Sequence, residues 1–250
     1  MADDTTEIRS LTARSAVLSV LLGAHPPHAP VSAIVRLGLE LGVQETTIRA
    51  ALTRMVAAGD LERDDAVYRL APRLRTRQLL QDQALDPDLE PWHGDWRLVL
   101  VTGSADAAAD RTALRELLQA DKFGEIREGA WGRPANLAPS VQVSEHPRLT
   151  EFIGRPSEPE ALAQRLFRPA EWADVARSLG SALDAATAMR DRLAVAAAMV
   201  RHILHDPLLP APYLPAAWPG EELRAVYGEF RAEFTAFAGS FLGAPANDFG

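Results

Sequence analysis

The chain of 250 residues contains no cysteine and only one lysine, Lys122. Without cysteine there can be no disulfide bonds and no thiolate chemistry, which suits a reducing compartment. No uninterrupted apolar run approaches the length of a membrane span, and we do not expect the polar start MADDTTEIRS to be a signal peptide. These features predict a soluble, cytoplasmic protein that has no membrane partner.

The short motifs that mark common catalytic sites are also missing. There is no HExxH metal motif, no GxSxG nucleophile turn and no glycine-rich phosphate loop. His202 and His205 are spaced like metal ligands on one helix, but no carboxylate motif accompanies them. We therefore expect no enzymatic activity, no catalytic residues, no cofactor and no metal site.

Positive charge is scarce, and apart from Lys122 it is carried by arginine. The net charge is −8 and the isoelectric point is about 5.3, whereas a nucleic-acid-binding domain is expected to be basic. Residues 44–77 depart from this acidity, because they hold seven arginines against five acidic residues. A balance of +2 predicts weak DNA binding by one copy, so a homodimer with paired contacts is the working expectation.

Residues 37–70 have the spacing that is typical of a winged helix-turn-helix. One apolar stripe at helical spacing ends at Gly42, and a second begins directly after it. The two stripes consist of Ile34, Leu37 and Leu41, then Val43, Ile48, Leu52 and Met55. Two short helices joined by a glycine-containing turn are therefore predicted.

The polar face of the second helix is the predicted DNA-reading surface. If the apolar stripe faces inward, helical periodicity turns hydroxyl, guanidinium and small side chains toward solvent. These residues are Thr46, Thr47, Arg49, Ala50, Thr53 and Arg54. Such groups can reach base edges and phosphates in the major groove. Two short strands then flank an Asp64-Asp65-Ala66 tip, which predicts a wing whose stem arginines, Arg63 and Arg69, contact the DNA backbone.

The rest of the chain predicts a linker, a small α+β domain and a helical region. The expected boundaries are 10–80 for the winged helix, 81–95 for a linker, 96–158 for a ferredoxin-like domain and 159–245 for a helical C-terminal domain. Strands are expected at 96–101, 126–131 and 141–143, with a helix over 110–118. Further helices are expected at 161–167, 170–179, 183–204 and 221–241, around a proline-rich loop at 206–220.

Nearly the whole chain resembles the PaaX-like transcriptional repressors of phenylacetate catabolism. The resemblance lies in several segments that occur in one order along the chain. They are Arg14-Ser15, TTIRAALTRM followed by Ala58-Gly59, PWHGDWRLV at 91–99, Gly129-Ala130-Trp131 with PANL at 134–137, DPLLP at 206–210 and LPAAWPG at 214–220. The resemblance implies an α+β, multi-domain chain with a winged helix, a central Cas2-like ferredoxin fold and a C-terminal helical domain. One departure is the acidic tip at Asp64 and Asp65, where the family's wing usually has a basic, glycine-bearing tip.

The resemblance further implies a dimeric repressor that a small effector, typically phenylacetyl-CoA or another aryl-CoA, releases from double-stranded operator DNA. Such a ligand needs an aromatic slot with nearby cations. Trp96, Trp131, Trp218 and Arg201 are therefore the candidate effector residues, although these tryptophans also suit ordinary core packing. The alternative function is a winged-helix protein-interaction module without sequence-specific DNA binding.

Overall fold

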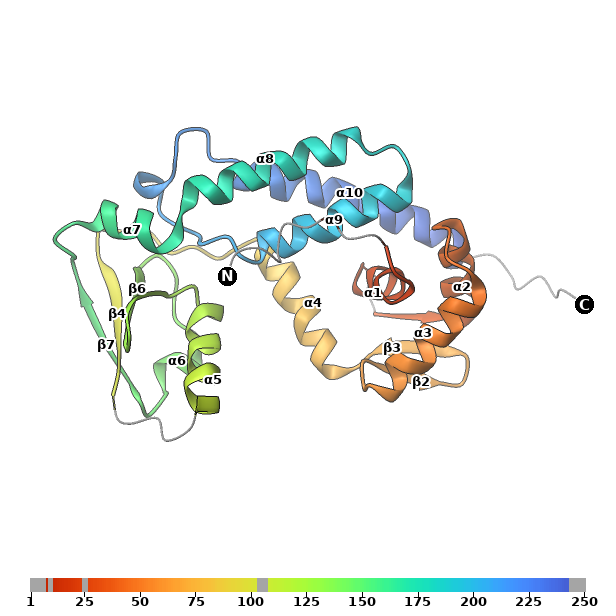
Figure 1. Ribbon diagram of the computed structural model, residues 1–250, viewed down its shortest axis with the longest axis horizontal. Coiled ribbons are helices and arrows are strands. Elements are labelled where there is room, and N and C mark those ends of the chain that lie inside the picture. The colour runs from red at the N-terminus through yellow and green to blue at the C-terminus, as the bar shows by residue number, and fades with distance from the viewer. Residues whose placement is uncertain (1–7, 9–10, 24–26, 103–107, 243–250) are drawn as a thin grey trace, which may run out of the picture. The chain divides into compact units, whose positions relative to one another are not determined.

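The computed structural model describes residues 8, 11–23, 27–102 and 108–242, which fold into two units (Figure 1). Unit 1 contains the described residues up to Asp86, Val175–His205 and those from Pro219 onward. Unit 2 contains Pro87–Asp174 and Asp206–Trp218. Both units combine helices with antiparallel sheet, so the predicted α+β class is confirmed.

The N-terminal part of unit 1 is a winged helix-turn-helix. Its helices are α1 (Ala13–Gly23), α2 (Val31–Glu40) and α3 (Glu45–Ala57), and its strands are β1 (His28–Pro30), β2 (Leu61–Asp64) and β3 (Val67–Leu70). The strands form an antiparallel sheet in the order β1-β3-β2. The predicted helix pair and the predicted wing hairpin are thus confirmed, while β1 was not predicted.

The predicted apolar stripes form the core of this winged helix. Ile34, Leu37 and Leu41 on one side, and Ile48, Leu52 and Met55 on the other, are each at most 2% exposed. Leu21 of α1 and Leu70 of β3 are also fully buried. Burial of each such side chain contributes about 1.5–3 kcal/mol to stability. Together these contributions fix α3 against α1 and α2.

Three further helices and the C-terminal part of α8 (Pro169–Ala185) complete the described part of unit 1. Helix α4 (Pro72–Leu85) begins with a proline in its first turn, where the missing backbone N–H costs no hydrogen bond, and it runs into the segment expected as linker. Helices α9 (Met189–Ile203) and α10 (Gly220–Leu242) pack on the winged helix through α4, α1 and α2. The sequence had assigned residues 159–245 to a domain of their own. None of the helices in the described ranges is long and apolar enough to cross a bilayer.

Side-chain hydrogen bonds connect α10 to α4 and to α2 of the winged helix. Arg231 Nη1 donates to Asp82 Oδ1 at 2.5 Å, and Arg224 Nε donates to the carbonyl oxygen of Ala84 at 2.8 Å. At the other end of α10, Arg36 of α2 donates to the carbonyl oxygen of Phe241. The C-terminal helix is therefore held at both ends by residues of the N-terminal 86.

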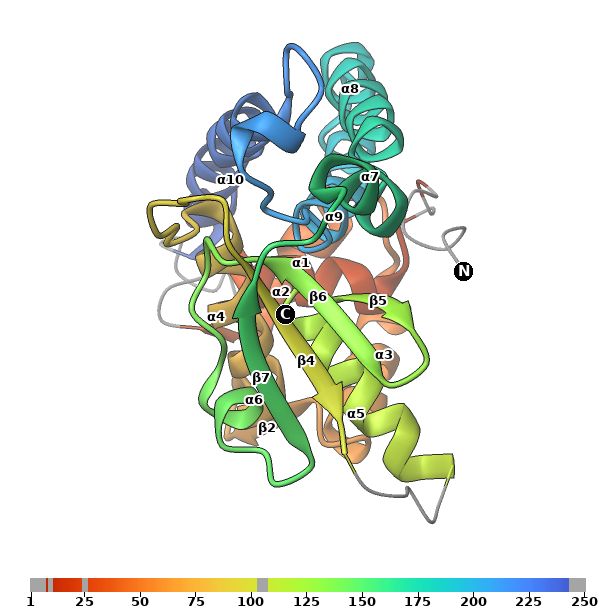
Figure 2. The same cartoon turned by 90° about the vertical axis from the view of Figure 1, so that its left-hand side faces the viewer.

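Unit 2 is built on a four-stranded antiparallel sheet. The elements are β4 (Trp96–Val101), α5 (Ala108–Ala120), β5 (Gly124–Arg127), β6 (Ala130–Pro134), α6 (Val141–Ser144) and β7 (Leu149–Gly154). The strand order is β5-β6-β4-β7, and Figure 2 shows β6, β4 and β7 side by side. A βαββαβ chain with this strand order is the ferredoxin-like fold that the sequence predicted.

Different helices cover the two faces of this sheet. Val99 and Trp131 face α5 and α6 in one hydrophobic cluster. Trp96 faces the opposite side, where it packs with Ala163 of α7 (Pro159–Phe167) and Tyr213 of η1 (Ala211–Tyr213). Trp96 Nε1 also donates to Tyr213 Oη at 3.1 Å. The proline-rich loop thereby closes over one face of the sheet.

Several sequence expectations were wrong in detail. Residues 141–143 form helix α6, because Ser140 Oγ accepts the Val143 N–H and caps a helical turn. The expected strand over 126–131 is a hairpin that turns at Gly129, whose φ is +74°. Strand β7 was missed. The expected helix over 183–204 is interrupted: α8 (Pro169–Ala185) ends within it, and α9 begins at Met189. No glycine or proline marks this break in the sequence.

Candidate nucleic-acid interface and candidate effector pocket

Helix α3 presents a continuous exposed face of short polar and cationic side chains. The six residues predicted to read DNA on this helix are all exposed, while Ile48, Ala51, Leu52 and Met55 are buried. They are Thr46, Thr47, Arg49, Ala50, Thr53 and Arg54. Thirteen residues make α3 about 20 Å long, a suitable length for a helix lying in the major groove.

The two arginines of this face differ in their local partners. Arg49 Nε donates to Glu45 Oε1 at 2.7 Å, one turn earlier, and both side chains are about half exposed. An exposed pair of this kind contributes little stability, so Arg49 can exchange Glu45 for another acceptor. Among the described residues Arg54 has no carboxylate partner. Arg54 is therefore the cation of α3 that needs no rearrangement to contact an anion.

Two glycines determine how α3 is held against α2. Gly38 of α2 lies against Ile48, and a β-carbon at this position would overlap the Ile48 side chain. Gly42, in the turn between the helices, has a φ of +74°. A residue with a β-carbon adopts this backbone conformation only at a cost in free energy. The turn and the close helix contact together fix which face of α3 is exposed.

The wing arginines are engaged by the wing itself. Arg63 Nε donates to the carbonyl oxygen of Asp65 at 2.7 Å, and its guanidinium lies over the Tyr68 ring. Arg69 Nη1 lies 3.4 Å from Asp64 Oδ2. Asp64 and Asp65 are both exposed. The hairpin places Arg63 and Arg69 on its stem as predicted, but Arg69 is paired with an acidic residue of the tip and Arg63 is held by a backbone carbonyl.

A buried carboxylate connects the end of α3 to two other helices. Asp60 is 2% exposed and follows the glycine that ends α3. Arg14 of α1 donates to Asp60 Oδ2 at 2.9 Å, and Arg73 of α4 donates to Oδ1. Burial by itself raises the pKa of Asp60, but the hydrogen bonds and charges of the two arginines outweigh it and lower the pKa below the ordinary value of 3.8. Asp60 is therefore ionised at neutral pH.

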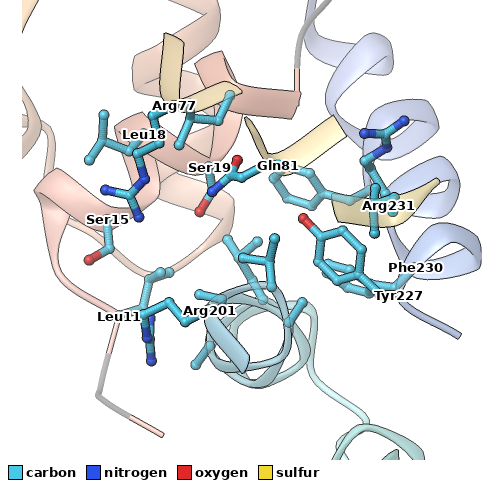
Figure 3. Close-up of a pocket in the computed structure, with 18 of the residues that line it drawn as sticks. Leu11, Ser15, Leu18, Ser19, Arg77, Gln81, Arg201, Tyr227, Phe230 and Arg231 are labelled. Carbon is cyan, nitrogen blue, oxygen red and sulfur yellow. The ribbon is translucent and has the colours of Figure 1, made fainter. Parts of the chain in front are cut away.

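A pocket of about 310 Å³ opens between α1, α4, α9 and α10, all within unit 1. Small and branched residues of α9, including Ala194, Ala197 and Val200, line one side of it. Figure 3 shows the residues that surround the space. On one side are Ser15, Ser19 and Arg77, and on the other are Tyr227, Phe230 and Arg231. The pocket thus combines aliphatic, aromatic and cationic walls.

Guanidinium groups dominate the charge of this pocket. Its charged lining residues are four arginines and one aspartate, namely Arg14, Arg77, Arg201, Arg231 and Asp82. Arg231 and Asp82 form an ion pair at 2.5 Å. Burial raises the pKa of the Tyr227 hydroxyl to about 12, with smaller opposed effects from Arg231 and Asp82. Tyr227 therefore keeps its proton at neutral pH and can donate a hydrogen bond.

The four predicted effector residues do not meet in one site. Arg201 is half-buried and lines the pocket of unit 1. Trp96 and Trp131 are 0% and 4% exposed, on opposite faces of the unit 2 sheet. Trp218 stacks on Trp172, with ring centroids 4.5 Å apart. The tryptophans thus have the packing roles that were the alternative to ligand binding, and their assignment to an effector site remains only a prediction.

Most residues of the pocket were not predicted from the sequence. A signal was present, because Tyr227, Phe230 and Phe234 recur at helical spacing on α10, and Ala194, Ala197 and Arg201 do so on α9. The spacing shows that each helix has a suitable face. It does not show that α1 and α4 lie opposite, since they are more than 100 residues away along the chain.

The described residues contain no cluster of three or more histidine or acidic side chains suited to a metal ion. His202 is buried, and the ring Nδ1 of His205 lies 2.7 Å from the carbonyl oxygen of Arg201. This contact with the last turn of α9 gives His205 a local structural role.

Comparison with known proteins gives matches along most of the chain. Residues 12–74 match the model described as PaaX-like protein, residues 89–150 the PaaX protein central Cas2-like domain, and residues 162–244 the PaaX-like protein C-terminal domain. Among solved structures, the uncharacterized protein Rv0674 from Mycobacterium tuberculosis is 46% identical, with a TM-score of 0.81. The match covers 93% of this chain and 99% of that chain. No curated protein matches the chain.

Proposed function

Because the chain belongs to the PaaX-like family, whose members are regulators of transcription, we propose that it is a repressor that binds double-stranded operator DNA as a homodimer. In this proposal α3 lies in the major groove. A small effector such as phenylacetyl-CoA or another aryl-CoA releases the protein from DNA, which ties its regulation to aromatic catabolism.

The observation that carries the proposal is the exposed face of α3. Apart from Glu45 in the first turn, which pairs with Arg49, the side chains on this face are small, hydroxyl-bearing or guanidinium groups, and none is a large apolar residue. Threonine and arginine supply hydrogen bonds to phosphates and base edges, and Ala50 permits close approach of the helix backbone. The apolar core behind the face and the turn at Gly42 hold it in place.

A homodimer is part of the proposal because one copy offers few cations. Arg63 and Arg69 are partly engaged by the wing tip, which leaves the α3 arginines and those of α4 as the main contacts. Two copies on a two-fold symmetric site double this number and read two half-sites. We expect the ligand to release the protein from DNA because we interpret the protein as a repressor.

The proposal is tested by fluorescence anisotropy with duplex DNA taken from upstream of the protein's own gene, titrated at several salt concentrations. We expect the logarithm of the association constant to fall steeply with the logarithm of salt concentration, because several phosphate contacts release counterions. Arg54→Ala should weaken binding, while Arg127→Ala, an exposed arginine of unit 2, should leave it unchanged. Absence of binding at low salt would favour the alternative, a winged helix that contacts another protein.

A further inference from the structure

The pocket between α1, α4, α9 and α10 has the chemistry of a site for an organic anion. The walls from α9 and α10 are aliphatic and aromatic, with Ala194, Ala197, Tyr227, Phe230 and Phe234 among them. Apolar walls with a few fixed polar groups are typical of small-molecule sites. The protonated Tyr227 hydroxyl adds a hydrogen-bond donor among these apolar walls.

The charge of the pocket is opposite to that of the whole chain. Four arginines against one aspartate give the lining a balance of +3, whereas the chain as a whole has a net charge of −8. Arg231 pairs with Asp82, and Arg14 pairs with Asp60, which is not among the lining residues, so guanidinium groups still outnumber carboxylates around the pocket. Guanidinium groups suit carboxylates and phosphates because they can donate two parallel hydrogen bonds.

The volume limits what can be enclosed. About 310 Å³ is at the low end of the range for sites that enclose drug-sized ligands. A single aromatic ring with a short acidic or acyl arm fits this space, whereas a complete nucleotide carrier does not. Any phosphorylated carrier would lie outside, toward the arginines at the edge.

One lining residue also belongs to the contact at the end of the recognition helix. Arg14 lines the pocket, and its guanidinium donates to the buried Asp60 at 2.9 Å. The Arg14 side chain is 55% exposed, so it can turn toward an anion in the pocket without leaving a buried cavity. Asp60 would then keep only Arg73, on the opposite helix.

We infer that this pocket binds a compact aromatic anion and that Arg14 transmits its occupancy to α3 by exchanging Asp60 for the ligand. The inference rests on the proposed function for its DNA-binding consequence, but not for ligand binding itself. The anion can be a free aryl carboxylate, or the acyl end of an aryl thioester whose carrier phosphates meet the arginines. Both offer an aromatic body next to negative charge.

Isothermal titration calorimetry of the full chain without DNA tests the pocket. The probes are phenylacetate, phenylacetyl-CoA and coenzyme A alone. Binding of phenylacetate identifies a carboxylate site, whereas binding of phenylacetyl-CoA but not phenylacetate identifies a thioester site. If only coenzyme A binds, or if none of the three binds, the inference of a compact aromatic anion is wrong.

Two variants on α4 provide a matched comparison for the binding probe. Arg75 and Arg77 are both exposed and lie two residues apart, but only Arg77 lines the pocket. We expect Arg77→Ala to lower the affinity for the probe about tenfold, as loss of one charge-assisted hydrogen bond does. Arg75→Ala should leave this affinity unchanged. Ala197→Trp, which places an indole in the space, should abolish binding. Equal affinities in all three variants would overturn the assignment of the site.

A second pair of variants tests the link to DNA. Arg14 and Arg73 bind the same carboxylate, but only Arg14 lines the pocket. With Arg73→Gln the probe should still lower DNA affinity at least tenfold, and with Arg14→Gln this effect should disappear. Thermal melts of both variants check that each is folded. A protein that binds the probe but no DNA would contradict the proposed function alone, while undiminished release in Arg14→Gln would contradict the link alone.

Discussion

Arg14 Nη2 lies 2.9 Å from Asp60 Oδ2, and this contact joins α1 to the segment between α3 and β2. The acceptor is almost fully buried, whereas more than half of the donor side chain is exposed. Loss of an exposed ion pair has little effect on stability, but a carboxylate left unpaired in the interior is costly. The contact therefore stabilises the winged helix while its cation stays accessible from the pocket.

Asp60→Asn should lower the free energy of unfolding by about 2 kcal/mol at neutral pH, because two charge-assisted hydrogen bonds become weaker neutral ones. The folded-state pKa of Asp60 is lowered, so its contribution is fully present above the ordinary value of 3.8 and is lost as the pH falls below it. Urea unfolding of both proteins between pH 3 and about pH 7 measures this. A difference that stayed constant across that range would contradict the assigned ionisation.

Gly42→Ala should destabilise unit 1 by about 1–2 kcal/mol, the cost of a left-handed backbone conformation for a residue with a β-carbon. Thermal unfolding measures the effect. Gly228→Ala on α10 is the matched control, because its φ is not positive and a β-carbon there would meet open space. Equal melting temperatures for Gly42→Ala and the wild type would show that the turn does not require this conformation.

Tyr213→Phe should lower the stability of unit 2 by about 1–3 kcal/mol, because the Trp96 indole N–H would lose its acceptor in a fully buried position. Tryptophan fluorescence during urea unfolding reports on unit 2, because all five tryptophans of the chain lie in that unit. Tyr68→Phe, in the wing of unit 1, provides a tyrosine control at a distant position in the sequence. An unchanged midpoint for Tyr213→Phe would mean that the hydrogen bond does not hold the proline-rich loop on the sheet.

Asp64→Asn should strengthen DNA binding, because it removes a negative charge from the wing tip and releases Arg69 from its ion pair. We expect an increase of about tenfold at low salt and a smaller one at high salt, where charges are screened. Anisotropy titrations at two salt concentrations measure both. The same affinity as the wild type at low salt would indicate that the wing does not approach the DNA backbone.

The sequence predicted the part of the fold in which local periodicity and tertiary packing agree. The stripe of Ile48, Leu52 and Met55 faces the core, as its spacing requires, and Gly42 ends the helix before it. Strand β1 was not predictable in this way, because three residues including Pro30 become a strand only by pairing with β3. Residues 141–143 were wrongly predicted as a strand because their two valines favour a strand. The serine before them, which caps a helical turn, was the signal for a helix.

The candidate interface was predictable and the candidate pocket was not. The α3 face depends on one helix, so its residues follow from the sequence alone. The pocket gathers residues from four helices, and of its lining residues only Arg201 was predicted to bind the effector. The tryptophans among the effector residues were predicted from their aromatic character alone. Trp96 and Trp131 are instead buried in the core of unit 2, and the aromatic groups of the pocket come from α10.

The central claim, that α3 reads a DNA sequence, is tested most directly by selecting bound duplexes from a random library over several rounds. Two copies that each place α3 in the major groove predict enrichment of a two-fold symmetric motif, with half-sites about one helical turn apart. The same selection with Arg54→Ala should lose or relax at least one position of each half-site. A wild-type selection that enriches no motif would contradict the account.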